Sequence, residues 1–256
     1  MSSTTSTADT VTLTLHDSGR AEITVDRPER HNAMTAEMYE ALLAHIERVA
    51  FTPSVRCVSL RGAGGKSFIS GTDITHFKDF TQGRQGLDYE AFVERVIDAV
   101  ERISVPTIAV IDGWAVGGGL ALAAACDFRI CTPASRFGAP IAKTLSNTLS
   151  ARNMVRLVAA LGVPRVKRML MLADYLSAED MLHNGFVHAV VEQGALAQTA
   201  SALAERLMAL SGTTQAAVKE SLRRSVVEQR LEDDDLVESV YGSAAFRSGV
   251  AAFIKP

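Results

Sequence analysis

The most informative stretch of the chain is Ile111-Asp-Gly-Trp-Ala-Val-Gly-Gly-Gly-Leu-Ala121. An apolar run leads there into three consecutive glycines, and an apolar segment rich in alanine follows from Leu120 to Cys126. The alanine content of that segment predicts a buried helix rather than a strand. The first N–H groups of a helix lack partners within it, and glycines place no side chains in front of them. Such a turn can stabilise an oxygen atom that gains negative charge.

A second glycine-containing turn lies upstream, in Lys66-Ser-Phe-Ile-Ser-Gly-Thr-Asp-Ile74. An apolar extended stretch meets Gly71 there, and a helix-prone segment follows. Two N–H donors, one from each turn, would form an oxyanion hole. Glycines also serve a purely structural role in close backbone packing, so the spacing alone leaves both interpretations open.

The segments around the two turns alternate between strands and helices. Alternating apolar residues predict a hairpin from 11–15 and 21–25, and Thr35 can cap a helix that runs to about Ala50. Apolar spacing predicts strands at 55–60, 107–111 and 128–131 and a helix at 89–102. From residue 150 onward it predicts a strand at 187–191 and helices near 150–161, 164–172, 178–184, 195–210, 213–229 and 232–247.

The composition is that of a globular protein with ample material for a core: 47% of the 256 residues are hydrophobic and 21% are charged. No linker rich in Pro, Gly or Ser divides the chain. We therefore expect one domain, with a disordered tail at 1–10, a core at 11–190 and a helical C-terminal section at 191–256.

Charge and cysteine content narrow the class of protein further. The formal net charge of −3 argues against broad attraction to nucleic acid or to an anionic membrane. No uninterrupted apolar run approaches the roughly 18 residues of a membrane span. Three cysteines, an odd number, argue against a disulfide framework. We expect a soluble, cytoplasmic protein.

Two glycine-rich segments fail as nucleotide sites. Gly64-Gly-Lys-Ser67 is similar to a P-loop, but Leu60 stands where that loop needs its first glycine. The triple-glycine turn has Leu122 where the dinucleotide fingerprint has its third glycine. The sequence also contains no Gly-x-Ser-x-Gly elbow and no Cys or His set with zinc spacing. We expect no metal ion and no separate cofactor.

Six motifs extend the pattern of the two turns along the chain. They are Arg27-Pro-Glu-Arg-His-Asn-Ala-Met34, Ser70-Gly-Thr-Asp-Ile74, Ala115-Val-Gly-Gly-Gly119, Cys126-Asp127, Phe137-Gly138 and Gly249-Val-Ala-Ala-Phe253. In this order the sequence resembles the enoyl-CoA hydratase/isomerase, or crotonase, superfamily from about Thr10 to Pro256. The resemblance implies an α/β, crotonase-like (ClpP/crotonase) fold with repeated strand-strand-helix turns. It also implies C-terminal helices that pack homotrimers, often paired into hexamers.

The same resemblance implies an acyl-CoA thioester substrate whose carbonyl oxygen is held by the N–H groups of Thr72 and Gly118. Preorganised donors at that oxygen stabilise an enolate-like transition state more than the ground state. Coenzyme A then enters as part of the substrate rather than as a cofactor. The positions that match the family's CoA contacts are Arg30, His31, Ser70, Asp73, Ile74 and Lys255.

The chain departs from the family's hydratases at their two catalytic glutamates. Ala121 and Ile141 occupy those positions, so the paired acid and base that add water to an enoyl-CoA are missing. By the resemblance, Glu94 falls where a dehalogenase-like branch holds a histidine, and Asn147 where some members hold an aspartate. Glu94 fits proton transfer and a solvated helix face equally well. Asn147 would orient the acyl group or a water molecule, because an amide does not titrate.

The sequence thus predicts an enzyme that acts on acyl-CoA, a lyase or isomerase of the enoyl-CoA hydratase/isomerase type, as found in fatty acid metabolism, with an altered acid/base set. The alternative is an acyl-CoA-binding protein with little or no catalysis, which the two missing glutamates favour. Retention of both glycine turns favours the enzyme. A serine hydrolase is a weaker third interpretation, because the nucleophile elbow is absent.

Overall fold

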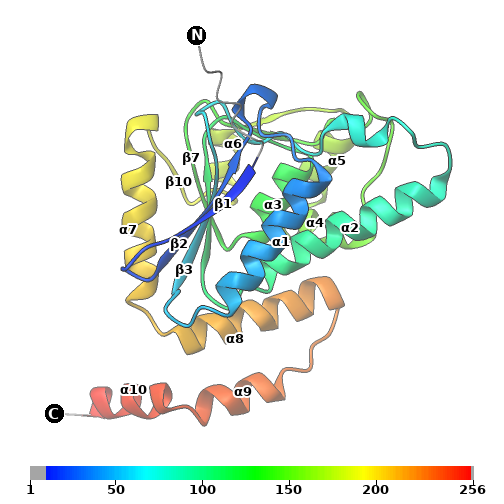
Figure 1. Ribbon diagram of the computed structural model, residues 1–256. Helices are drawn as coiled ribbons and strands as arrows, with labels where there is room; N and C mark the ends of the chain where they lie inside the picture. Colours follow the sequence, from blue (N-terminus) through cyan, green and yellow to red (C-terminus); the bar gives the residue numbers. More distant parts are fainter. Residues whose placement is uncertain (1–9, 255–256) are drawn as a thin grey trace.

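The structure, a computed structural model, describes residues 10–254 and contains two β-sheets (Figure 1). The larger sheet has the strand order β1-β2-β3-β5-β7-β10. Its strands are β1 (Thr10–Leu15), β2 (Arg20–Asp26), β3 (Cys57–Gly62), β5 (Thr107–Ile111), β7 (Phe128–Cys131) and β10 (Ala189–Val190). Neighbouring strands pair in parallel except β1 and β2, which form the predicted hairpin.

The smaller sheet has the strand order β4-β6-β8-β9. Its strands are β4 (Ser67–Ile69), β6 (Trp114–Val116), β8 (Arg136–Gly138) and β9 (Leu176–Ser177). Each of β4, β6 and β8 follows a strand of the larger sheet along the chain, and a helix comes after it. This order is the strand-strand-helix repeat expected from the sequence.

Helices cover both faces of the larger sheet (Figure 1). On one side lie α1 (Ala36–Ala50), α2 (Gly83–Glu101), α3 (Gly118–Ala125) and α4 (Ala151–Leu161), and on the other lies α7 (Leu196–Met208). Two short helices, α5 (Val163–Met171) and α6 (Ala178–His183), follow α4. Along β5, Ile108 and Val110 pack with α7, whereas Ala109 and Ile111 pack in the main core with α1, α2 and α3. Both faces of this sheet are therefore buried, as a parallel sheet requires.

The sequences of α1 and α3 explain how these helices form. Thr35 caps α1, because its side chain accepts a hydrogen bond of 3.3 Å from the N–H of Met38. Leu42 and Ile46 then recur at helical spacing and are buried, each contributing about 1.5–3 kcal/mol through the hydrophobic effect. Most residues of α3 are buried, as its alanine-rich composition predicted, so it runs through the core rather than over the surface.

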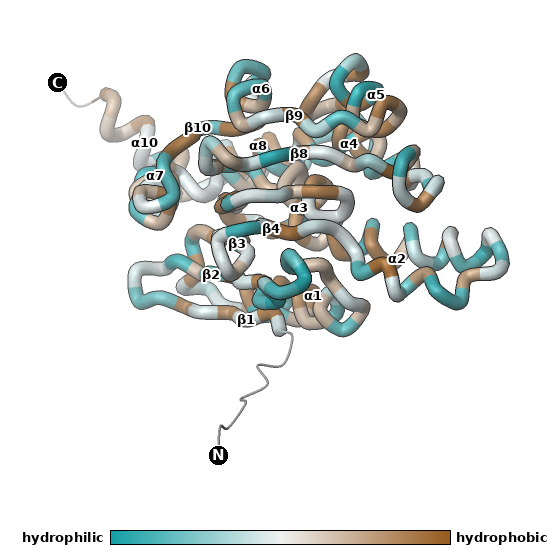
Figure 2. Tube along the Cα trace, turned by 90° about the horizontal axis from the view of Figure 1, so that it is seen from above, coloured by the Kyte–Doolittle hydropathy of each residue, from teal (hydrophilic) through white to brown (hydrophobic). Residues whose placement is uncertain are grey.

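The C-terminal section differs from the predicted pattern. α8 (Gly212–Arg223) ends in a π-helical turn (Arg224–Glu228). The single helix predicted at 232–247 is two helices, α9 (Asp234–Tyr241) and α10 (Ala244–Ile254). The break has a local cause: Gly242 is a poor helix former, and Ser243 caps α10 by accepting a hydrogen bond of 3.0 Å from the N–H of Phe246. α9 and α10 run below α8 (Figure 1), and α10 projects on the side opposite α2 (Figure 2).

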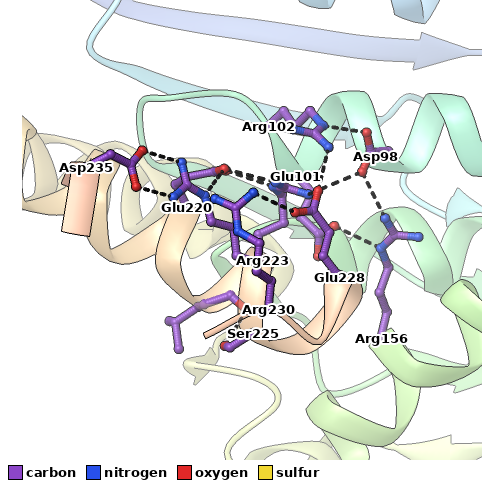
Figure 3. A network of polar contacts seen from close by, with 12 residues as sticks. Asp98, Glu101, Arg102, Arg156, Glu220, Arg223, Ser225, Glu228, Arg230 and Asp235 are labelled. Carbon is purple, nitrogen blue, oxygen red and sulfur yellow. Dashed lines mark hydrogen bonds and ion pairs between the residues drawn. The ribbon is translucent and has the colours of Figure 1, made fainter. Parts of the chain in front are cut away.

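A network of ion pairs attaches the C-terminal helices to α2 and α4 (Figure 3). Two buried arginines, Arg156 of α4 and Arg223 of α8, lie at its centre. The pairs are Arg156–Glu101 (2.9 Å), Arg156–Asp98 (3.2 Å), Arg102–Asp98 (2.6 Å), Arg102–Glu228 (3.2 Å), Arg223–Glu228 and Arg223–Glu220 (2.8 Å each), and Arg224–Asp235 (2.6 Å). Each buried guanidinium thus has two carboxylate partners, which a buried charge needs.

The remaining sequence predictions on organisation have mixed outcomes. The helix predicted from residue 89 already begins at Gly83, and the strand predicted at 55–60 lies at 57–62. Of the expected tail at 1–10, only Thr10 lies within the described residues, and it begins β1. The division at residue 190 stays a prediction. No helix within residues 10–254 has both the length and the apolarity that crossing a bilayer requires.

Candidate active site

The two glycine turns singled out from the sequence meet in the structure. Gly71, just after β4, and Gly117, just before α3, both have positive φ angles (103° and 54°), which glycine adopts without strain. A Cβ atom on Gly71 would lie 3.6 Å from the backbone nitrogen of Gly118. A Cβ atom on Gly119 would lie 1.9 Å from the carbonyl oxygen of Ile69, so that position requires glycine. Parallel pairing of β4 with β6 brings the two turns together.

Two backbone N–H groups at this junction, those of Thr72 and Gly118, have no hydrogen-bond partner among the described residues. The N–H of Met34 donates to the carbonyl oxygen of Gly71 (2.8 Å), and the N–H of Asp73 donates to that of Met34 (2.9 Å). Because successive N–H groups of an extended chain point to opposite sides, the N–H of Thr72 points away from Met34. Gly118 is the first residue of α3, where the N–H has no partner within the helix.

A cavity of about 240 Å³ lies at this junction, and Thr72 and Gly118 both line it. Most of its other lining side chains are apolar. They include Val93 and Ile97 of α2, Val116, Leu145 and Leu149. The cavity therefore combines an apolar wall with two free N–H groups.

Ala121, Ile141 and Asn147 also line the cavity. Ala121 and Ile141, at which the sequence analysis expects the two glutamates of the family's hydratases, thus present a methyl group and a branched aliphatic side chain to the cavity. Asn147 lies in the exposed segment between β8 and α4. Its place in the cavity agrees with the sequence analysis, and its role stays a prediction.

Three hydroxyl groups form a chain at Thr72. Its Oγ1 lies 2.9 Å from the hydroxyl of Tyr39 and 2.7 Å from the hydroxyl of Tyr89. Burial raises the pKa of Tyr39, which is only 1% exposed, and raises the pKa of Tyr89 to about 12. Both phenols are therefore neutral near pH 7 and serve as hydrogen-bonding groups that fix Thr72. A Cβ atom on Gly118 would lie 2.6 Å from the Tyr39 hydroxyl, so Tyr39 also touches the second turn.

Glu90 supplies the one carboxylate that lines the cavity within residues 10–254. Its Oε2 accepts a hydrogen bond of 2.7 Å from the N–H of Ser150, the residue that caps α4. No donor in the described part of the chain reaches its Oε1. Burial raises the pKa of Glu90 above its ordinary value, the hydrogen bond from Ser150 opposes the rise, and the charge of Glu94 adds to it.

Glu94, the carboxylate that the sequence placed in the site, is not among the residues that line the cavity. Its carboxylate pairs instead with Arg152 of α4 at 3.4 Å. Glu90 precedes it by one helical turn and shares the face of Val93 and Ile97, at spacings of three and seven residues. Glu94 lies three residues before Ile97, so the apolar spacing in the sequence did not distinguish the two carboxylates.

The residues that the resemblance assigned to CoA lie on two adjacent segments, apart from Lys255, which is outside the described residues. The first segment carries Arg30 and His31, and the second carries Ser70, Asp73 and Ile74. The N–H of Ser70 donates to the carbonyl oxygen of His31 at 3.2 Å. Buried Asn32 ties the first segment to β4, because its Nδ2 donates to the carbonyl oxygen of Ser67 at 2.7 Å.

Asp73 and Ile74 differ in what they offer a ligand. The Asp73 carboxylate accepts a hydrogen bond of 3.0 Å from the N–H of Thr75 and pairs with Arg27 at 2.6 Å, and these partners lower its pKa to about 2. Its side chain is thus already engaged in holding the loop. Ile74 is 67% exposed and also lines the cavity, so it lies where the cavity opens to solvent.

Comparison with known proteins identifies the family. The sequence profile described as Enoyl-CoA hydratase/isomerase matches residues 16–255. The chain belongs to the enoyl-CoA hydratase/isomerase family. It is 29% identical over 226 residues to a short-chain-enoyl-CoA hydratase of Clostridium acetobutylicum, covering 88% of this chain and 84% of that protein. It is 35% identical over 204 residues to the (E)-benzylidenesuccinyl-CoA hydratase of Thauera aromatica, covering 77% of this chain and 78% of that protein.

Solved structures of enoyl-CoA hydratase/isomerase family members share the fold. An enoyl-CoA hydratase/carnithine racemase from Magnetospirillum magneticum matches with a TM-score of 0.86 and 28% identity, covering 95% of this chain and 91% of that chain. An enoyl-CoA hydratase from Bacillus anthracis matches with a TM-score of 0.84 and 25% identity, covering 95% of each chain. The resemblance and the α/β crotonase-like fold expected from the sequence are confirmed.

Proposed function

We propose that this chain is an enzyme that acts on acyl-CoA thioesters, and that the N–H groups of Thr72 and Gly118 hold the thioester carbonyl oxygen. One observation carries the proposal. Two N–H groups without partners meet at the wall of an apolar cavity, on turns that glycine alone permits to approach so closely. Membership of the enoyl-CoA hydratase/isomerase family supports the choice of substrate class.

The chemistry next to a thioester explains why this arrangement would accelerate a reaction. Water addition, proton shift and decarboxylation all pass through an enolate-like state, in which charge moves onto the carbonyl oxygen. N–H groups fixed by a strand turn and a helix start need no reorganisation when that charge develops, so they stabilise the transition state more than the ground state. The hydroxyls of Tyr39 and Tyr89 keep Thr72 in place during this step.

The reaction we propose belongs to the lyase or isomerase class but is not hydration by a pair of glutamates. Ala121 and Ile141 line the cavity and carry no acid or base. We propose that Asn147 orients the acyl group or a water molecule from the same wall. Glu94 does not line the cavity, so another carboxylate takes its place in this proposal.

We propose that the two segments beside the cavity opening bind the CoA moiety. Their candidate residues, with Lys255, are Arg30, His31, Ser70, Asp73 and Ile74. The exposed Arg30 and His31 supply basic groups for phosphate, while the engaged Asp73 contributes through the shape of its loop.

The C-terminal helices suggest how the protein assembles. Apolar side chains are exposed along α9 and α10, namely Val237, Tyr241, Phe246, Val250, Phe253 and Ile254. Since contiguous exposed apolar patches mark interaction sites, we propose that these helices pack a homotrimer or hexamer. We also propose a cytoplasmic location, with which three free, buried cysteines agree.

The alternative function is an acyl-CoA-binding protein with little catalysis. The aliphatic side chains of Ala121 and Ile141 in the cavity favour it. A turnover screen with a panel of acyl-CoAs separates the two, because only the enzyme consumes one of them.

Calorimetry tests the substrate class itself. Butyryl-CoA should bind to the protein, whereas butyrate at the same concentration should bind poorly, since most of the proposed contacts are made to the CoA moiety and the thioester. Equal affinity for butyrate and butyryl-CoA would contradict the assignment.

A further inference from the structure

Proton transfer at the carbon next to a thioester needs a group that accepts a proton near neutral pH. Glu90 is the one carboxylate that lines the cavity within residues 10–254, and Thr72 and Gly118 line the same cavity. Resting on the function proposed above, we infer that Glu90 is the acid/base residue that moves the proton at the α-carbon of the bound thioester.

The position of Glu90 on α2 directs it into the site. Val93 and Ile97 lie on the same helical face and also line the cavity, so this face of α2 forms part of the wall. The N–H of Ser150 anchors Oε2 at 2.7 Å, while Oε1 has no donor among the described residues. One oxygen therefore fixes the orientation of the carboxylate, and the other is free to accept a proton.

The other polar side chains of the cavity do not compete for this role. The amides of Asn147 and Asn153 and the hydroxyl of Thr144 do not titrate near neutral pH. The phenol of Tyr89 lines the cavity, but burial raises its pKa to about 12, so it stays protonated. Glu90 is the one carboxyl group among the side chains that line the cavity within residues 10–254.

The charges around Glu90 favour a carboxylate that holds its proton more tightly than usual. Burial raises its pKa, and Glu94 on the next turn adds a like charge, which is partly neutralised by Arg152 at 3.4 Å. The phenols of Tyr39 and Tyr89 lie nearby and are neutral. The N–H of Ser150, at the start of α4, is the main opposing influence. A carboxyl group with a raised pKa can both accept and return a proton near neutral pH.

The proposed step balances without any further reactant. Oε1 of the ionised Glu90 accepts the α-proton as the C–H bond breaks. The electron pair of that bond forms the carbon–carbon double bond of the enolate, and the carbonyl π pair moves onto the oxygen held by Thr72 and Gly118. Return of the proton from Glu90 to carbon regenerates the carboxylate and the thioester, and in D₂O a deuteron that has replaced the carboxyl proton from solvent returns instead.

Exchange of the α-hydrogens of butyryl-CoA in D₂O, followed by NMR, measures this step directly, whatever the complete reaction is. The wild-type protein should exchange them, and Glu90→Gln should lower the rate by about 10²-fold or more while butyryl-CoA still binds in calorimetry. Asp88→Asn is the matched control on α2. Asp88 pairs with Arg84 in solvent at 3.1 Å, so its loss should leave the exchange rate unchanged.

The pH profile distinguishes proton transfer from a structural role of Glu90. Because the ionised form accepts the proton, the wild-type rate should rise with pH through a pKa above the roughly 4.3 of an ordinary glutamate. The rate of Glu90→Gln should show no such rise with pH, whereas a variant that only disturbs packing would keep the rise. Circular dichroism checks that both variants are folded.

Several results would overturn the inference. A wild-type protein that binds butyryl-CoA and exchanges no α-hydrogen contradicts the role of Glu90 and leaves the binding-protein alternative standing. Loss of exchange in Glu94→Gln with a normal rate in Glu90→Gln returns the role to Glu94. Absence of butyryl-CoA binding in the wild-type protein instead contradicts the proposed function on which the inference rests.

Discussion

At the scale of single residues, Ala121 and Ile141 are the reason that the reaction proposed above is not hydration by two glutamates. Both side chains line the cavity beside the two free N–H groups, and neither can donate or accept a proton. In the proposed function, the site therefore stabilises an enolate but lacks the pair of groups that adds water.

Hydration of crotonyl-CoA should accordingly be slow or undetectable. Each missing acid or base costs about 10²–10⁴-fold in rate. The measurement is the loss of the enoyl absorbance at saturating crotonyl-CoA. A rate close to that of a hydratase with two glutamates would show that another pair of groups in the cavity performs the reaction.

Thr72 should matter for stability through its hydroxyl as well as for chemistry through its N–H. Thr72→Val keeps the shape and the N–H but leaves the buried Tyr39 hydroxyl without its partner, so the free energy of unfolding should fall by about 1–3 kcal/mol. Urea titration measures this loss. Adding Tyr39→Phe removes the unpaired hydroxyl and should recover part of it, and no recovery would mean that the hydroxyl chain does not stabilise Thr72.

The sequence predicted the two glycine turns because their signal is local. Glycines at 71 and 117–119 mark turns that the backbone geometry requires, and the structure brings those turns together. Glu94 was chosen by counting from Pro106, and such counting does not determine which residue of a helix lies against the cavity. One helical turn separates Glu94 from Glu90, yet only Glu90 lies on the wall of the cavity.

At the scale of secondary structure elements, the buried Arg223 shows how α8 is held. Glu220 and Glu228 both pair with it at 2.8 Å, and Arg224 extends the network to α9 through Asp235 (Figure 3). The hydrogen bond from Arg223 is the main reason that the pKa of Glu220 falls to about 2. Glu220 thus prefers its ionised form in the folded protein.

Acid should weaken this part of the structure. The pKa of Glu220 is lower in the folded protein than in the unfolded chain, where it is about 4.3. Its charge therefore stabilises the fold above that pH, and the contribution is lost as pH falls toward 2. At pH 7, Glu220→Gln should lower the free energy of unfolding by about 1–3 kcal/mol. The difference in melting temperature between Glu220→Gln and wild type should shrink as pH falls from about 5 to about 2. Asp88→Asn should follow wild type throughout, and a constant difference for Glu220→Gln would contradict the role of its charge.

Long elements were predictable and short ones were not. The hairpin, α1 and α3 each carry enough residues for a period or a composition to emerge. The strands β6, β8 and β9 have two or three residues, too few to show an alternation, so the smaller sheet follows from the family resemblance and not from the pattern. The break between α9 and α10 was not predicted, because the apolar spacing continues across Gly242.

At the scale of the whole molecule, α9 and α10 form a C-terminal arm with exposed apolar side chains, which we propose are covered by other copies of the chain. Light scattering should give three or six times the chain mass of 27.4 kDa. Phe253 is 95% exposed, so Phe253→Glu should not disturb a single chain and should shift the protein toward monomer. A monomer at micromolar concentration in the wild-type protein would contradict the proposed assembly.

The two glycine turns, from distant parts of the chain, form a site only because the smaller sheet pairs β4 with β6. In the proposed function, the N–H of Gly118 stabilises charge on a thioester oxygen. Gly118 starts α3, a position where proline is tolerated, so Gly118→Pro replaces this N–H by the ring carbon Cδ without removing a hydrogen bond of the helix. Tyr39→Phe in the same chain removes the hydroxyl that the new Cβ atom would meet. Tyr39→Phe/Gly118→Ala adds the same Cβ atom and keeps the N–H, so it is the matched control.

The most direct measurement compares α-hydrogen exchange of butyryl-CoA in these two double variants. Loss of one oxyanion donor lowers rates by about 10²–10³-fold, so Tyr39→Phe/Gly118→Pro should exchange that much more slowly than Tyr39→Phe/Gly118→Ala. Calorimetry should find similar affinities for butyryl-CoA in both. Equal exchange rates in the two folded variants would remove the Gly118 N–H from the mechanism and contradict the account.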